Sequence, residues 1–193
     1  MNRPLKFISA SIAAVIVAII VVVAVLSMNS APHFAFPSYQ QVNGASGSSY
    51  TAQKYSNSSY SNGSVGNGAV KIETMNYTSA KPFLEVGIVQ YKTAGDAANN
   101  YISMNNSIAK IAASLPNMTT AHATYRGYAY AYVIMPHNIT VYGTTLHLGI
   151  SIAVCHLDNF IFVMYSNFAG MNAGRMTGLI DLQINVMTGG SLI

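Results

Sequence analysis

The chain has 193 residues, 51% of them hydrophobic and only 7% charged, whereas about a quarter of the residues in an ordinary soluble domain are charged. Arg3 and Lys6 precede an apolar run, which leaves seven basic and five acidic residues beyond it and no basic cluster suited to several phosphates. These features exclude nucleic acid as a partner, and the single cysteine, Cys155, excludes an intrachain disulfide framework.

The first predicted element is a membrane span. Phe7–Leu26 is uncharged and rich in Ile and Val, and a helix of about 20 residues matches a hydrocarbon core of about 30 Å. We expect residues 7–27 to be a transmembrane anchor in the lipid bilayer. Residues 1–6 should then be cytoplasmic, because Arg3 and Lys6 precede the run. A cleaved signal peptide, whose apolar region is usually shorter, and a pilin-type leader are the alternatives.

A polar segment follows the predicted anchor. Residues 28–68 are dominated by Ser, Gly, Asn and Tyr and show no hydrophobic periodicity. Such a composition buries too little apolar surface to offset the entropy of ordering the chain. We therefore expect a flexible stalk over 28–68 that carries one extracytoplasmic domain, residues 69–193.

The first half of that domain predicts a hairpin and a helix. Alternating apolar residues predict strands over 69–78 and 83–91, joined through Ser79–Pro82. Thr93 and Asp96 resemble a capping box, and the apolar residues after them predict a helix of about 20 residues that ends at Pro116.

The second half predicts three strands and a helix. One strand covers 125–135, and strands over 141–157 and 160–168 are joined by a tight turn at Asp158 and Asn159. Asn172 can cap a final helix that ends before Gly189. The order ββαβββα predicts an α+β fold in which an antiparallel sheet carries two helices, most simply on one face.

Two groups of residues are candidates for surface function. On the strand over 125–135, Tyr128, Tyr130 and Tyr132 share one face, which would form an aromatic contact surface if open and would be core if covered. Six Asn-x-Ser/Thr sequons, a mild excess over chance, fit glycosylation outside the cell. They are Asn57, Asn62, Asn76, Asn105, Asn117 and Asn138.

Residues suited to catalysis or metal binding do not form a convincing set. A blue-copper site needs two His, a Cys and a weak axial ligand, and Cys155, His156 and Met164 supply the types. However, Cys155 and His156 are adjacent in a strand and should point to opposite faces. The flanks of Cys155 favour a buried side chain over a nucleophile. We expect no metal, no cofactor and no enzymatic activity.

The basic start, the Val/Ile anchor, the segments SSYTAQKYSNSSYSNGS and VGIVQYKTAGDA, and LIDLQINVM near the end together resemble single-span, membrane-anchored envelope proteins of thermoacidophilic archaea. The resemblance implies an acidic exterior but no activity. We expect a tethered, non-catalytic binding or structural module with a protein partner, either an envelope component or an accessory subunit of a membrane complex. The alternative is a small redox or ligand-binding domain that serves a respiratory chain.

Overall fold

The computed structural model describes residues 31–59, 68–79, 83–115, 117–136, 138–141, 144–147 and 149–190. The expected anchor, residues 7–27, lies outside these ranges. Among the residues that are described, no helix combines the length and apolar character needed to cross a membrane.

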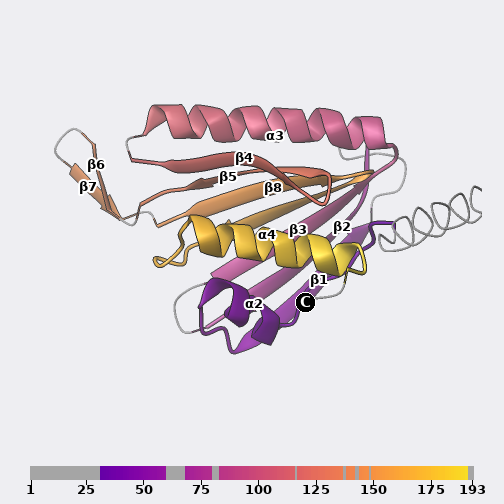
Figure 1. Cartoon of the computed structure of the whole chain (residues 1–193), viewed down its shortest axis with the longest axis horizontal. Coiled ribbons are helices and arrows are strands. Elements are labelled where there is room, and N and C mark those ends of the chain that lie inside the picture. Colours follow the sequence, from indigo (N-terminus) through magenta and orange to yellow (C-terminus); the bar gives the residue numbers. More distant parts are fainter. Residues whose placement is uncertain are drawn as a thin grey trace, which may run out of the picture.

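Seven of the described strands form one antiparallel sheet, in the order β1-β2-β3-β9-β8-β5-β4 (Figure 1). Their bounds are β1 Ala52–Ser59, β2 Ala69–Thr78, β3 Phe83–Tyr91, β4 Thr119–Tyr125, β5 Tyr128–Ile134, β8 Ser151–Leu157 and β9 Phe160–Ser166. A separate small hairpin, β6 Asn138–Val141 and β7 Thr144–His147, projects beyond one end of the sheet in Figure 1. The predicted α+β class with an antiparallel sheet is therefore confirmed.

The helices are α2 Tyr39–Ser46, α3 Ala94–Ser114 and α4 Ala173–Met187. Helix α3 packs on one face of the sheet over a core that includes Ala131, Val154 and Ile161. Helices α2 and α4 pack on the other face, over a larger core that includes Leu84, Cys155 and Phe162 (Figure 1). The expectation that both helices share one face is wrong, because the central strands are buried on both sides.

Several predicted boundaries agree with the structure. Strands β2 and β3 have the expected ends, and Thr93 caps α3 by accepting a hydrogen bond from the backbone N–H of Asp96 at 3.0 Å. Asn172 caps α4 by accepting one from the N–H of Arg175 at 3.0 Å. Asp158 in the β8–β9 turn has a φ of 49°, a left-handed conformation that Asp tolerates at tight turns.

Two predicted strands are divided. The strand expected over 125–135 is the end of a hairpin, because Arg126 and Gly127 turn the chain with positive φ between β4 and β5. The strand expected over 141–157 comprises the second half of the β6–β7 hairpin and then β8. The described elements therefore include more strands than the predicted order ββαβββα.

The expected stalk is also corrected, because residues 31–59 are part of the domain. Strand β1 pairs with β2 along its whole length, and Val42 of α2 and Tyr50 are 1% and 2% exposed. The Asn43 side chain fixes the turn between them, since it donates to the Tyr50 carbonyl at 2.9 Å and accepts from the Tyr50 N–H at 2.7 Å. The domain boundary expected at residue 69 therefore lies at or before residue 31.

The segment before α2 crosses the sheet on the side of α4. Phe34 packs edge-on against Phe160, with ring centroids 5.3 Å apart, and the Tyr77 hydroxyl donates to the Pro37 carbonyl at 2.7 Å. The His33 N–H donates to the Met187 carbonyl at 3.1 Å, at the end of α4. We call residues 31–38 the strap. The strap and α2 both pack against α4, and the Gln183 amide donates to the Ala35 carbonyl of the strap at 2.8 Å, so more of α4 is buried than one amphipathic stripe predicts.

Asp181 on α4 gives the domain a pH dependence. Its Oδ1 is buried and has no hydrogen-bond partner among the described residues, and burial raises the pKa of the carboxyl above its ordinary value of 3.8. The fold therefore favours the protonated acid, so stability rises as the pH falls through the raised pKa and is lost as the pH rises again. Its titratable neighbours Tyr130 and Cys155 have raised pKa values through burial and stay neutral in this range.

We expect Asp181→Asn to raise the melting temperature at pH 7 and to leave it unchanged near pH 3, because the amide mimics the protonated acid. Thermal unfolding followed by circular dichroism between pH 3 and 7 measures both. Glu85→Asn, at an exposed position on β3, is the control for a simple loss of charge. A melting temperature for Asp181→Asn that falls at pH 7 would contradict this assignment.

Candidate binding site beside helix α3

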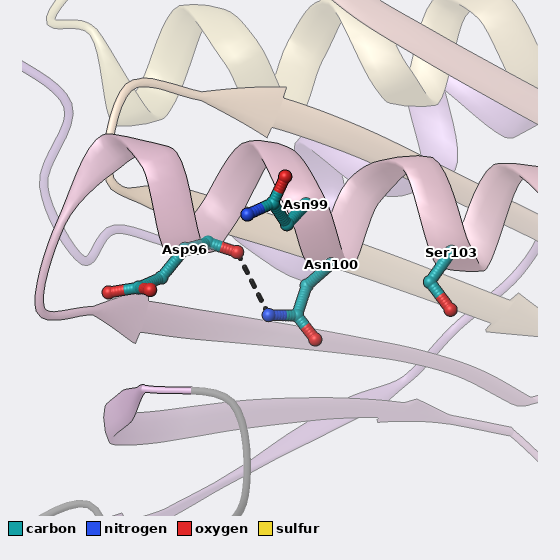
Figure 2. A pocket seen from close by; sticks show the side chains of 4 residues that line it. All are labelled: Asp96, Asn99, Asn100 and Ser103. Carbon is teal, nitrogen blue, oxygen red and sulfur yellow. Dashed lines mark hydrogen bonds between the residues drawn. The ribbon is translucent and has the colours of Figure 1, made fainter.

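A polar hollow lies along the first half of α3. It has a volume of about 260 Å³ and is lined by Asp96, Asn99, Asn100 and Ser103 (Figure 2). Residues three or four apart share a helix face, so Asp96, Asn100 and Ser103 follow one another along the helix. Figure 2 shows these three side chains pointing to the same side. These three side chains offer a carboxylate, a carboxamide and a hydroxyl to a ligand, and Asn99 adds a second carboxamide.

Local hydrogen bonds hold the side chains at the Asp96 end of the polar hollow. The Thr93 hydroxyl donates to Oδ2 of Asp96 at 2.8 Å. The Asn100 amide donates to the Asp96 carbonyl at 2.9 Å, as Figure 2 shows. Gly68 has a φ of +81°, and a Cβ there would lie 2.9 Å from Cγ of Asp96. Glycine therefore lets the start of β2 pass close to the carboxylate.

An apolar hollow continues from the polar one along the second half of α3. It has a volume of about 290 Å³ and lies between α3 and strands β8 and β9. Its lining residues are Ser103, Met104, Ser107, Ile108, Ile111, Ile152 and Val163. Ser103 lines both hollows, so they are neighbours along α3, and their lining residues from 96 to 111 cover about 22 Å at 1.5 Å per helical residue. We call the two hollows together the α3 trough.

The α3 trough suits an amphiphilic ligand. Carboxylate and carboxamide groups at the Asp96 end can accept hydrogen bonds from hydroxyl or amine groups, and the Asn side chains can also donate. The Ile108 and Ile111 end offers apolar contacts. Small-molecule sites usually combine an apolar lining with a small number of polar groups.

A third hollow, of about 310 Å³, lies at the end of the sheet where β5 ends and α4 begins. Its lining includes Asn117, Met135, Phe168 and Asn172. The side-chain oxygen of Asn172 already accepts the hydrogen bond that caps α4. This hollow mixes polar and apolar residues without the separation seen in the α3 trough, and it is the weaker candidate.

The expected aromatic contact surface is covered. Tyr130 and Tyr132 are 6% and 4% exposed, in the core beneath α4, and Tyr128 packs against the edge of that core. The opposite face of β5, with Ala131 and Val133, packs under α3. The three tyrosines are therefore core residues, and the interpretation as a binding platform is wrong.

The sequons differ in exposure. Asn57, Asn117 and Asn138 are exposed, whereas Asn76 lies half-buried within β2 and Asn105 lies half-buried in α3 with its Oδ1 buried. Asn62 lies outside the described residues. An acceptor asparagine must present its amide to an enzyme, so the exposed positions are the better acceptors.

If the chain is glycosylated, we expect glycans at Asn57, Asn117 and Asn138 and unmodified side chains at Asn76 and Asn105. Peptide mass spectrometry of protein from its native source measures the occupancy of each site. Full occupancy at Asn105 with none at Asn117 would contradict the burial of these side chains.

Cys155 and the histidine next to it lie on opposite faces of the sheet. Cys155 is fully buried in the core beneath α4, and burial raises the pKa of its thiol well above the usual range. His156 stacks on Tyr101 of α3, with ring centroids 5.9 Å apart. Among the described residues, no group of three or more His, Cys, Asp or Glu side chains is placed to hold a metal ion.

The polar half of the α3 trough was missed at the level of sequence. The sequence predicts Asp96 as a cap, but Asp96, Asn99, Asn100 and Ser103 also recur at helical spacing in a helix whose other face is apolar. That polar stripe was visible. What the sequence could not show is that α3 leaves a hollow on this side, because the hollow depends on how the helix lies over β8 and β9.

The class defined by these features is a three-layer domain, with α3 on one face of an antiparallel sheet and α2 and α4 on the other. No model of a known protein family matches the chain, and no curated protein matches it either. Among solved structures, it is similar to the extracellular domain of PknH from Mycobacterium tuberculosis, at 12% identity and a TM-score of 0.49. That match covers 80% of this chain and 97% of the other. A likeness this distant carries no functional argument.

Proposed function

We propose that this protein is a non-catalytic binding module, tethered to the outer face of a membrane by residues 7–27, whose ligand occupies the α3 trough. It would act as an envelope component or as an accessory subunit of a membrane complex. The observation that carries the proposal is the trough itself, with hydrogen-bonding groups at the Asp96 end and apolar side chains at the Ile111 end.

The tethered location is supported by the sequence. The uncharged run Phe7–Leu26 is long enough to span a bilayer, and Arg3 and Lys6 before it favour a cytoplasmic N-terminus. Exposed sequons at Asn57 and Asn117 agree with an external domain. An amine-reactive reagent that does not cross membranes should label exposed Lys54 and Lys110 in intact cells. Labelling only after lysis would contradict this location.

The ligand of the trough can be captured by photo-crosslinking in native membranes. We would place benzoylphenylalanine at position 107, which lines the apolar hollow, or at 109, which is exposed on the same helix but outside that lining. The proposal predicts a distinct product from position 107 that position 109 does not give. Identical products at both positions, or none at 107, would contradict it.

A second variant tests whether one ligand spans both halves of the trough. Asn100→Leu removes hydrogen-bonding groups from the polar hollow, on the same side of α3 as Ser103, and leaves the apolar hollow unchanged. Loss of one hydrogen bond to the ligand should reduce the yield from position 107 about two- to tenfold. An unchanged yield would mean that the ligand contacts the apolar hollow alone.

A further inference from the structure

We propose that the domain lies directly against the bilayer, and that the end of the sheet carrying Lys92 and Arg126 contacts anionic lipid headgroups. This inference rests on the proposed anchor at residues 7–27. It differs from the expectation of a long stalk, which would have carried the domain clear of the membrane.

The first step concerns chain length. Pro32 is the first buried residue of the strap, so residues 28–31 separate the packed part of the domain from the end of the proposed anchor. The five Cα–Cα steps from residue 27 to residue 32 reach about 17 Å at full extension. The headgroup layer takes up roughly 5–8 Å of that on each side of the bilayer. The packed domain therefore begins within about 12 Å of the headgroup surface.

The second step identifies which end of the domain lies there. His33 bonds to Met187 at the C-terminal end of α4, and Phe34 packs on Phe160 at the start of β9. In an antiparallel sheet, that end also carries the β4–β5 turn, the β8–β9 turn and the connection from β3 to α3 (Figure 1). The β6–β7 hairpin projects from the opposite end (Figure 1).

The third step is the charge at this end. Lys92, directly after β3, is exposed, and so is Arg126 in the β4–β5 turn. The Arg126 guanidinium lies beside Gly190, where a Cβ would clash with it, so this side chain rests against the end of α4. Lys71, nearby on β2, is neutralised by an ion pair with Glu73. Asp158 is an exposed acid at the same end, and Asp96 in the first turn of α3 lies there too, so two acids offset the two cations. The net electrostatic attraction for anionic lipid is therefore small, and the short tether provides the orientation.

The test compares two threonines at opposite ends of the exposed edge strand β4. Thr124 and Thr120 are both exposed and share one face, about 13 Å apart along the strand. Each is replaced by Cys in the full chain and labelled with a fluorophore. Buried Cys155 should not react. The protein is reconstituted in vesicles of phosphatidylcholine and phosphatidylglycerol that contain a headgroup-linked nitroxide quencher.

We expect quenching at position 124 at least about threefold stronger than at position 120, because the quencher acts only at short range. Inserting about twelve Gly and Ser residues after Asn29 should remove this difference by lifting the domain. With the native tether, Lys92→Glu combined with Arg126→Glu should lower quenching at position 124. Equal quenching at both positions in membrane-inserted protein would overturn the inference. Protein that does not float with the vesicles would instead refute the proposed anchor.

Discussion

Replacing both Tyr130 and Tyr132 by Ser is expected to unfold the domain. Both side chains are buried beneath α4, and truncating a large buried aromatic residue costs about 3–5 kcal/mol. Two such losses approach or exceed the typical total stability of about 5–15 kcal/mol. Chemical denaturation of the full chain, followed by circular dichroism, measures the loss.

The matched control is Tyr55→Ser, since Tyr55 is 46% exposed on β1, where its ring contacts Phe36 edge-on. It should cost about 1 kcal/mol or less. A double variant at positions 130 and 132 that stays folded but loses a partner would restore the interpretation of these residues as an open contact surface.

Tyr77→Ala is expected to release the N-terminal part of the domain. Tyr77 is fully buried, packs near Tyr50 with ring centroids 6.2 Å apart, and holds Pro37 through its hydroxyl. The cavity should cost about 3–5 kcal/mol. Limited proteolysis should then cut within residues 31–51 much faster than in the native protein.

Tyr77→Phe separates the hydrogen bond from the packing. It keeps the ring but removes the donor to the Pro37 carbonyl, so it should cost about 1 kcal/mol and increase cleavage only slightly. Cleavage of the native chain within residues 31–51 at the rate seen for Tyr77→Ala would contradict the docking of this segment.

The elements that could be predicted from sequence are those with a clear local signal. The alternation in β2 and β3 and the caps at Thr93 and Asn172 each agree with the structure. The β4–β5 turn was missed because β4 is polar and exposed along most of its length, so it shows no apolar alternation.

The sequence of β9 does carry a signal for the layer arrangement. The strand β9, with the sequence FIFVMYS, is apolar at nearly every position, and such runs are typical of strands that are covered on both faces. Helix α2 and strand β1 carry almost no sequence signal for their place in the fold. Every residue of β1 is exposed, and its place depends on pairing with β2 and on a few long-range contacts such as Phe36 with Tyr55. Composition describes such a segment as flexible, because it does not record those contacts.

These differences also change the position of the candidate site. With a stalk of about 40 residues, the trough could take any height above the membrane. With the domain beginning at the strap, Asp96 lies in the first turn of α3, at the end of the sheet that faces the proposed bilayer. The polar half of the α3 trough would then be nearer the membrane than the apolar half at Ile111.

The most direct test of this account is hydrogen–deuterium exchange of the full chain in a lipid bilayer, read over residues 31–59. If this segment is part of the domain, the Tyr50 amide, the Val42 amide in α2 and the β1 amides bonded to β2 should exchange far more slowly than unstructured peptide. Complete exchange of residues 31–59 at the rate of unstructured peptide, with β8 and β9 protected, would contradict it.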